Sequence, residues 1–423
     1  RVEYINTYLN TEKAFDKLIY KYLIENGSIT GGQVCRLLYD QGVLSYDADM
    51  YSKLTSGSVS AYDFVISKIK SLEITPAMLA LEPCSATVTA VEPGTGNVLA
   101  MVSYPSYDNN AFSGSVDYET WTTLSEDLSS PLFDRATKMR TAPGSTFKPL
   151  SAITGLETGV VDTSSIIACN GIFDKITPSP KCWVYPSRHG AQNVVQAIKN
   201  SCNSFFYEVA YRLSTRNGSF NEAEGLSYFR KYGEMVGLTE TSGVEVEEYS
   251  PLFSTTSPIT SAIGQGSHSF TSVQLARYVN TLASGGTNYE LTLIKDIVEL
   301  NGTKHTLPEK DVTVIDVSES TISTVQEGMR QAAQGYSSIN SLDFSVAAKT
   351  GTAQESANSP DHALMIAFAP YDEPQISLSV MIQNGYTSSY ASNLASDILK
   401  YYFGETTLEQ ILNGSADGPA AGE

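Results

Sequence analysis

The hydrophobic pattern of this 423-residue sequence changes its period twice along the chain. Apolar residues alternate with polar or small ones around a turn rich in Pro and Gly at 93–97, and alternation returns near the C-terminus. The strands predicted from this alternation cover 86–91, 98–102, 345–352, 362–369 and 375–383. The segments between these two groups have helical spacing. Strands from both parts of a chain with helices between them predict an α+β domain built on one antiparallel sheet.

Changes of composition divide the chain into three regions. Residues 1–76 are predicted to form a small N-terminal helical module, because apolar residues recur at helical spacing in Gln33–Tyr39 and Ala61–Leu72. Residues 77–405 contain the strands and form the main domain. Residues 406–423 are predicted to be a disordered tail, since they end in a low-complexity run of small residues.

Charge and hydropathy exclude two classes of function. The chain has 27 Lys and Arg against 46 Asp and Glu, a net charge of −19. This charge repels phosphate backbones, so no nucleic-acid partner is expected. No apolar run reaches the roughly 18 residues that a membrane-spanning helix needs. Any anchor or targeting segment would therefore have been removed from this chain or was never part of it.

The cysteines and histidines show none of the short spacings that bring several ligands to one metal ion. There is no C-x-x-C and no H-E-x-x-H among five Cys and four His, so the sequence predicts no metal site and no cofactor. Cys169 and Cys182 bracket a loop that contains Gly and Pro. They are interpreted either as two free, partly buried thiols or, in an oxidising compartment, as a disulfide.

The first motif that carries chemistry is Ser145 with Lys148, which follows Pro143 and Gly144 at the start of a predicted helix. Residues three apart share a helix face, so the hydroxyl and the amine come within reach of each other. An amine can remove the proton of a serine if burial or a nearby cation lowers its pKa from about 10.4. A lone S-x-x-K is weak evidence, because Ser67 begins another one in an ordinary helix.

Two further motifs follow Ser145 in the sequence. Ser201 and Asn203 form an S-x-N, which is a common pattern and informative only through its position. The run 349–352, Lys-Thr-Gly-Thr, occurs once and ends a predicted strand. A cation, two hydroxyls and a residue without a side chain would let an extended peptide carboxylate lie along this strand edge. Taken alone, Lys349 could equally be a solvated residue at the end of a strand.

In this order and spacing the three motifs resemble those of penicillin-recognising serine acyl enzymes. Over residues 77–405 the sequence resembles the class B penicillin-binding proteins, which are peptidoglycan D,D-transpeptidases. The resemblance implies their transpeptidase fold, with an antiparallel sheet flanked by helices and an all-helical subdomain. Asp134 departs from the pattern, since many relatives have Asn before the Arg-Ala pair. The segments that carry the resemblance are 106–110, 134–136, 142–149, 189–190, 263–266 and 349–353.

The resemblance implies a catalytic role for each motif residue. Ser145 is expected to attack the penultimate D-Ala carbonyl of a stem peptide, while Lys148 takes its proton. Ser201 would pass a proton to the leaving amine, and Asn203 would hold the substrate amide. Lys349 would keep the site positive and help to keep Lys148 neutral.

The same resemblance implies how substrate is bound. Backbone N–H groups of Ser145 and Thr352 would form the oxyanion hole. The hydroxyls of Thr350 and Thr352 would receive the terminal carboxylate, and Gly351 would leave room for it. His189 is interpreted as structural, because Lys148 already supplies a base and no G-x-S-x-G elbow is present.

Two alternatives share this acyl-serine site. A D,D-carboxypeptidase or β-lactamase would need an activated water, and the only E-x-x-x-N spacing, Glu409 to Asn413, lies near the tail. A β-lactam sensor would acylate without turnover. The expected partners are peptidoglycan stem peptides, β-lactam antibiotics and a membrane glycosyltransferase of the division or elongation machinery. The expected location is the outer face of the bacterial cell membrane, with the N-terminal anchor helix absent from this chain.

Overall fold

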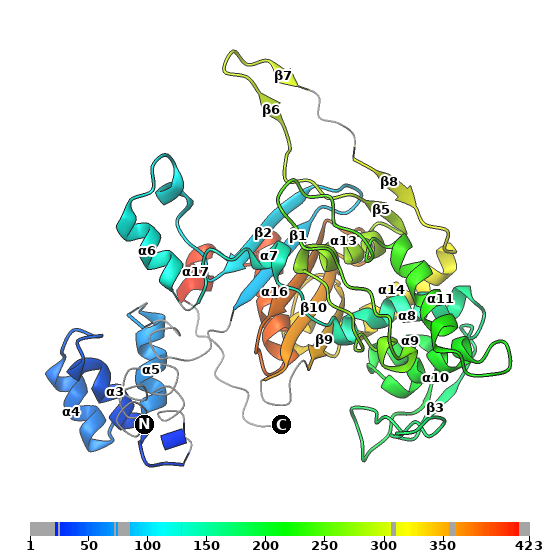
Figure 1. Cartoon of the computed structure of the whole chain (residues 1–423), viewed down its shortest axis with the longest axis horizontal. Helices are drawn as coiled ribbons and strands as arrows, with labels where there is room; N and C mark the ends of the chain where they lie inside the picture. Colours follow the sequence, from blue (N-terminus) through cyan, green and yellow to red (C-terminus); the bar gives the residue numbers. More distant parts are fainter. Residues whose placement is uncertain are drawn as a thin grey trace, which may run out of the picture. The chain divides into compact units, whose positions relative to one another are not determined.

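The computed structural model describes residues 22–23, 26–71, 73–74, 85–127, 129–305, 310–354 and 360–413. Its centre is a single antiparallel sheet whose five strands come from both parts of the sequence (Figure 1). The strand order is β2-β1-β11-β10-β9. The strands are β1 (Ala86–Val91), β2 (Val98–Tyr104), β9 (Ala347–Ala353), β10 (His362–Ala369) and β11 (Ile376–Ile382). The predicted α+β fold with one sheet formed from both parts of the chain is therefore confirmed.

Residues alternate between two buried faces in the central strands β10 and β11. Met365 and Ala367 face the helix α16 (Ser388–Tyr402), whereas Leu364 and Ile366 belong to the larger core on the other side. The helix α13 (Ser272–Ala283) packs on that other side against β1 and β11. Burial on both faces explains why β10 is apolar along its whole length instead of alternating with charged residues.

The helical part of this domain lies between β2 and β9 in the sequence. The helix α8 is buried almost entirely and packs against α9, α10, α11 and α14. Three small two-stranded sheets decorate this region. The helices of this part are α7 (Arg135–Lys138), η3 (Gly144–Phe147), α8 (Lys148–Glu157), α9 (Val194–Lys199), α10 (Asn203–Ser214), α11 (Glu222–Met235), α12 (Pro258–Ser261), α14 (Glu319–Ala333) and α15 (Ser337–Asn340). Outside it, η2 (Asn109–Phe112) follows β2, and α17 (Leu408–Asn413) follows α16. The short strands are β3 (Ile167–Cys169), β4 (Gly190–Gln192), β5 (Thr287–Tyr289), β6 (Ile297–Val298), β7 (Lys304–His305) and β8 (Val312–Val314).

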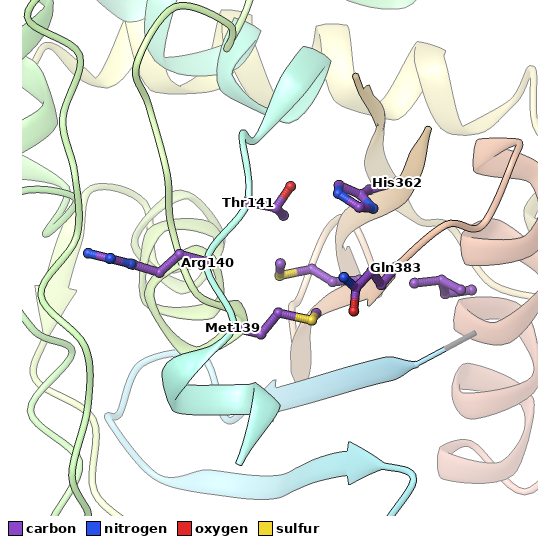
Figure 2. A pocket seen from close by; sticks show the side chains of 7 residues that line it. Met139, Arg140, Thr141, His362 and Gln383 are labelled. Atoms are coloured by element: carbon purple, nitrogen blue, oxygen red, sulfur yellow. The ribbon is translucent and has the colours of Figure 1, made fainter. Parts of the chain in front are cut away.

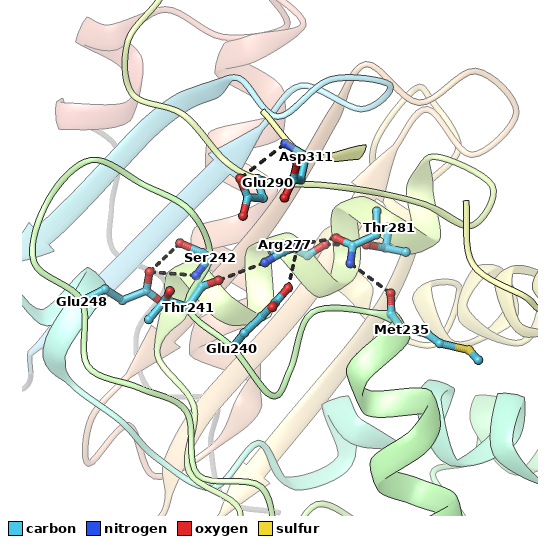
Figure 3. A network of polar contacts seen from close by, with 10 residues as sticks. Met235, Glu240, Thr241, Ser242, Glu248, Arg277, Thr281, Glu290 and Asp311 are labelled. Atoms are coloured by element: carbon cyan, nitrogen blue, oxygen red, sulfur yellow. Dashed lines mark hydrogen bonds and ion pairs between the residues drawn. The ribbon is translucent and has the colours of Figure 1, made fainter. Parts of the chain in front are cut away.

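A buried cation holds α13 to the loop that follows α11 (Figure 3). The Arg277 guanidinium is 4% exposed and forms an ion pair with Glu240 at 3.0 Å. It also donates to the carbonyl of Thr241 at 2.9 Å and to Asn288 Oδ1 at 2.9 Å. Because α13 packs on the sheet, this network fixes the helical part of the domain against the strands.

The chain divides into two compact units, and the smaller one comprises residues 1–84 and 110–130. Its described helices are α3 (Gly31–Asp40), α4 (Ala48–Ser56), α5 (Ala61–Lys70) and α6 (Tyr118–Glu126). Phe64, Leu38 and Leu54 form the core of the first three. Thr30 and Ser60 cap α3 and α5, so both begin where the sequence places a hydroxyl.

The two ends of the chain are described only in part. Residues 1–21 of the expected N-terminal module and residues 414–423 of the expected tail lie outside the described residues. The segment from residue 406 onward begins with the short helix α17. Within the described ranges, no helix is both long and apolar enough to cross a membrane.

Candidate active site

Ser145 lies in a single turn of 3-10 helix, η3, that runs directly into α8. In this geometry residues three apart are eclipsed, so Ser145 and Lys148 project on the same side. Pro149 occupies the first turn of α8, where it loses no hydrogen bond. Ser145 is partly exposed, whereas Lys148 is 0% exposed. The fold thus places a partly exposed hydroxyl and a buried amine on the same side of this turn.

Close backbone packing places the η3 turn against the edge strand β9. Gly144 has φ +51°, and a Cβ on it would lie 2.5 Å from the carbonyl oxygen of Thr352. Its N–H donates to the carbonyl of Gly264 at 2.9 Å. Only glycine accepts this conformation and this approach without strain. The approach brings the backbone of the Ser145 turn beside Thr352. The expected oxyanion hole needs the N–H groups of both residues at this place.

The amine of Lys148 lies within a cage of oxygen atoms from the second motif. Its Nζ is 2.7 Å from the Ser201 carbonyl oxygen, 2.9 Å from Ser201 Oγ and 2.6 Å from Asn203 Oδ1. A neutral amine has two N–H donors, which the carbonyl and amide oxygens can accept. Its lone pair is then left for a hydroxyl. This arrangement suits a base that receives a proton from a serine.

Burial lowers the pKa of Lys148 well below its usual range, and the nearby charge of Lys349 lowers it further. Lys349 is 1% exposed, and burial lowers its pKa to about 7. The sequence-based alternative, a solvated lysine at a strand end, is therefore wrong. Two buried amines so close together cannot both hold a proton cheaply, which favours a neutral Lys148 beside a cationic Lys349.

Ser201 adopts a backbone conformation that serine rarely takes. It follows α9 with φ +50°, in the left-handed region. The N–H of Ser201 still donates to Ile198, and that of Cys202 to Ala197, so both ends of the turn are held. Such a conformation costs of order 1 kcal/mol or more and persists where the surroundings impose it. Here it places both the carbonyl and the hydroxyl of Ser201 on Lys148.

The strand β9 forms one edge of the sheet and carries the third motif. Residues of an antiparallel strand point their N–H and C=O alternately to the partner and to the open edge. Thr350 points outward, because its N–H donates to the Tyr336 hydroxyl at 3.2 Å. Thr352, two residues further on, therefore points outward as well, and its side chain is exposed. Gly351 faces β10, and a Cβ there would lie 2.7 Å from the carbonyl of Pro143.

Tyr336 is a residue of this edge that the sequence did not indicate. Its hydroxyl oxygen also accepts from Thr350 Oγ1 at 3.0 Å, and Lys349 Nζ donates to the Thr350 carbonyl at 3.0 Å. The Thr350 hydroxyl, expected to receive substrate carboxylate, is thus engaged in this structure. Burial raises the pKa of the Tyr336 phenol, which keeps it neutral.

Next to the second motif, four possible metal ligands converge. One ligand atom from each residue lies within 4.8 Å of all the others: Cys169, Cys182, His189 and Cys202. The three cysteines are free thiols, which agrees with the free-thiol interpretation of Cys169 and Cys182. Three buried sulfurs and one partly buried imidazole form a donor set that suits Zn²⁺. The sequence predicted no metal site because it lacks short ligand spacings. The folded chain nevertheless brings together four possible ligands that lie far apart in the sequence.

The electrostatics of the cluster favour thiolate at one position. The hydrogen bond with Cys202 lowers the pKa of Cys182 and raises that of Cys202, and backbone N–H groups of Asn203 and Ser204 also stabilise the Cys182 thiolate. His189 Nδ1 lies 3.5 Å from Cys182 Sγ and 3.6 Å from Cys169 Sγ. This position agrees with the interpretation of His189 as structural, since its ring lies against Cys169, Cys182 and Trp183.

A separate hollow lies between the segment before η3 and the ends of β10 and β11 (Figure 2). Its lining contains none of the motif residues, although Thr141 is only four residues before Ser145. The residues that line it are Met139, Arg140, Thr141, His362, Met381, Ile382 and Gln383. The hollow is therefore separate from the three motifs.

A serine in a helical turn, a buried lysine base and a strand edge with a second lysine together define a penicillin-recognising acyl-serine site. Residues 86–400 match the family model of the penicillin binding protein transpeptidase domain. The chain belongs to this family, and it is a class B penicillin-binding protein, as the sequence predicted.

Individual relatives agree with this assignment. The peptidoglycan D,D-transpeptidase MrdA of Acinetobacter baumannii is 27% identical over 352 residues, which cover 74% of this chain and 50% of MrdA. The structure of Pseudomonas aeruginosa PBP2 in complex with WCK 5153 has a TM-score of 0.66 and 26% identity, and the match covers 75% of this chain and 74% of that one. A structure from a peptidoglycan synthase complex has a TM-score of 0.67 and 26% identity, over 77% and 56% of the two chains. The chain spans about half the length of MrdA.

Proposed function

We propose that this chain is a peptidoglycan D,D-transpeptidase that cross-links stem peptides through an acyl-enzyme on Ser145. The observation that supports this most is the fully buried Lys148 amine, held by Ser201 and Asn203 and lowered in pKa by burial and by Lys349. A lysine in this state can accept a serine proton near neutral pH. β-Lactams would acylate the same serine.

In the first half-reaction the stem peptide lies along β9 with its penultimate D-Ala carbonyl between the N–H groups of Ser145 and Thr352. Lys148 accepts the Ser145 proton as the hydroxyl attacks this carbonyl. The tetrahedral oxyanion is stabilised by the two N–H groups. Collapse breaks the peptide bond, and Ser201 delivers a proton from Lys148 to the departing D-Ala nitrogen.

In the second half-reaction an amine of another stem peptide attacks the acyl-enzyme. It transfers a proton to the Ser201 and Lys148 pair as the new amide bond forms, and Ser145 recovers its proton. Transpeptidation is favoured over hydrolysis because the site lacks a carboxylate base among its described neighbours. Glu409, of the only E-x-x-x-N spacing, lies in α17 and not at the motifs.

The test uses a D-Ala depsipeptide donor with a D-amino acid as acceptor amine. A transpeptidase forms the amide product in proportion to acceptor concentration, and the product disappears after treatment with penicillin. A carboxypeptidase or β-lactamase would give only hydrolysed donor. A sensor would acylate once, release one equivalent of the leaving group per site and form no further product, an outcome that would rule out the proposed activity.

For the cellular setting, we propose the outer face of the bacterial membrane, where peptidoglycan is cross-linked. A structure from a complex that coordinates polymerization and crosslinking is among those similar to this chain. A membrane glycosyltransferase that makes the glycan strands is therefore the proposed partner. An N-terminal membrane helix upstream of this chain would provide the tether.

We further propose that Cys169, Cys182, His189 and Cys202 hold one structural Zn²⁺. Cys202 lies between Ser201 and Asn203, so an ion bound there would fix the strained turn that supplies three oxygens to Lys148. All four ligands belong to this chain, and they leave no open position for catalysis by the metal. The ion would stabilise the site without taking part in a reaction step.

A further inference from the structure

The outer edge of β9 is blocked at Thr350 by groups of the protein itself. The Tyr336 hydroxyl accepts the outward N–H of Thr350, and Lys349 Nζ donates to its outward carbonyl. The Tyr336 oxygen thus stands where an acceptor atom of an added strand would have to lie. A peptide that pairs with β9 can use the edge at Thr352 but not at Thr350.

The spacing of these two residues sets a length. Consecutive outward residues of a strand are about 7 Å apart, because each residue advances roughly 3.4 Å. A substrate that runs antiparallel to β9 points its C-terminal end from Thr352 toward Thr350. If its scissile carbonyl lies at Thr352, one further residue fits before Tyr336 and a second would collide with it.

The position of Tyr336 is fixed by its neighbours, so it can block the strand edge sterically. It follows α14, which packs along β9, and it caps α15, whose Asn340 N–H donates to the Tyr336 carbonyl. Its ring packs against the core between the sheet and α16. Moving the ring out of the edge would break both bonds to Thr350 and expose this apolar surface.

We infer that Tyr336 is a specificity-determining residue that limits the leaving group to a single amino acid, and so makes the enzyme act at the chain end of stem peptides. This inference rests on the proposed function, because it takes the scissile carbonyl to lie at Thr352. Tyr336 touches neither the nucleophile nor the base, and it acts only on what can extend beyond the scissile bond.

The experiment compares two acyl donors on the same protein. One is a D-Ala depsipeptide whose leaving group is a single hydroxy acid, and the other carries one additional Gly on that leaving group. The wild type should acylate from the short donor with a kcat/KM at least about 100-fold above that for the extended donor. Tyr336→Leu keeps an apolar contact but withdraws from the edge, so this ratio should fall at least tenfold. Tyr336→Phe keeps the ring but removes the hydroxyl oxygen that occupies the Thr350 N–H, so this variant should lose part of the discrimination.

Two controls separate the possible failures. Tyr371→Leu removes another tyrosine near the sheet, one whose hydroxyl lies 3.4 Å from Glu327 Oε2, and it should leave the ratio at its wild-type value. Labelling with fluorescent penicillin counts the folded, active sites in each variant and normalises the rates. A Tyr336→Leu protein that loses both donors equally would show a merely structural tyrosine and overturn the inference. A wild type that labels with penicillin but accepts both donors equally would also overturn it, whereas one that takes neither donor would contradict the proposed function.

Discussion

The amine of Lys148 lies 2.6 Å from Asn203 Oδ1, and none of its side chain is exposed to solvent. This contact joins the first motif to the second across 55 residues of sequence. A charged lysine in this position would be desolvated and would face Lys349. The neutral base is therefore favoured before substrate arrives, and its protonation state depends on residues of the second and third motifs.

Acylation by penicillin should occur on Ser145 alone. Ser145→Ala should reduce labelling by about 1,000-fold or more, because Ser145 is the partly exposed hydroxyl of the turn that packs against Thr352, where the proposed oxyanion hole lies. Peptide mass spectrometry of labelled protein identifies the adduct. Ser67→Ala is the matched control, since Ser67 also begins an S-x-x-K but its hydroxyl donates to the helix carbonyl of Phe64. An adduct on Ser67 or Ser201 would refute the assignment.

The pH dependence of acylation should be bell-shaped. The second-order rate should rise with pH as Lys148 becomes neutral, and fall as pH passes about 7, where free Lys349 loses the charge that attracts a substrate carboxylate. Lys349→Ala should remove the falling limb and shift the rising limb to higher pH, because Lys148 would no longer be repelled by a neighbouring cation. Stopped-flow labelling between pH 5 and 9 measures both limbs.

The control for this profile is Lys138→Ala, whose amine pairs with Glu247 and is partly exposed. It should leave both limbs in place. If the pH profile of Lys349→Ala instead matches the wild type in both limbs, Lys349 acts only as a packing residue.

Burial of Lys349 also predicts an effect on stability. Its pKa is lower in the folded state, so the unfolded chain binds more protons between pH 7 and its usual value of about 10.4, and the wild-type melting temperature should rise with pH over that window.

Stability and activity should separate at Ser201. Ser201→Gly should relieve the left-handed backbone, and Ser201→Ala should not, so the glycine variant should be more stable by about 1 kcal/mol. Both variants lose the hydroxyl that passes protons, and both should lose turnover with the depsipeptide donor. Thermal melting and turnover measured on the same samples test the separation. Full turnover in either variant would remove Ser201 from the proton path.

Zinc should be bound in a ratio of one ion per chain. Metal analysis of the purified protein should find it, and Cys169→Ser should lose it and lower the melting temperature by several degrees, since a tightly bound ion stabilises the folded state by a few kcal/mol. Cys35→Ser is the control, because Cys35 is also buried and free but lies in the smaller unit. A metal-free protein whose melting temperature is unchanged by added Zn²⁺ would contradict the structural ion.

Local patterns explain why much of the site could be predicted from sequence. Ser145 and Lys148 lie in one helical turn, and Lys349 to Thr352 lie on one strand, so the spacing itself sets their geometry. The sheet was predictable because alternation marked the strands on either side of the turn at 93–97, and short strand-like segments separated by turn residues marked those near the C-terminus. The proposed zinc ligands come from separate segments around β3, β4 and α10, and only the folded chain brings them together. Tyr336 escaped notice because it lies between two helices with no motif around it.

The left-handed conformation of Ser201 could not be predicted for a similar reason. Glycine and asparagine are the usual signals of such a backbone, and the sequence places a serine there. Contacts that form only in the folded protein impose this conformation. Lys148 Nζ bonds to the Ser201 carbonyl and hydroxyl, and the next residue, Cys202, belongs to the thiol cluster. The clearest sequence signal of a forced backbone was instead Gly144, which precedes the nucleophile and has a positive φ.

The close approach of η3 and β9 can be tested at Gly144. Gly144→Ala adds a methyl 2.5 Å from the Thr352 carbonyl at φ +51°, so the Ser145 turn must move away from the strand. A displacement of about 1 Å can cost roughly 100-fold in rate, and penicillin labelling should slow by that order. Gly159→Ala is matched in backbone, with φ +69°, but its methyl would meet nothing within 4 Å. Gly159→Ala should therefore cost about 1 kcal/mol of stability and leave labelling unchanged. Equal labelling rates in the two variants would show that Ser145 and Thr352 do not need this contact to form the oxyanion hole.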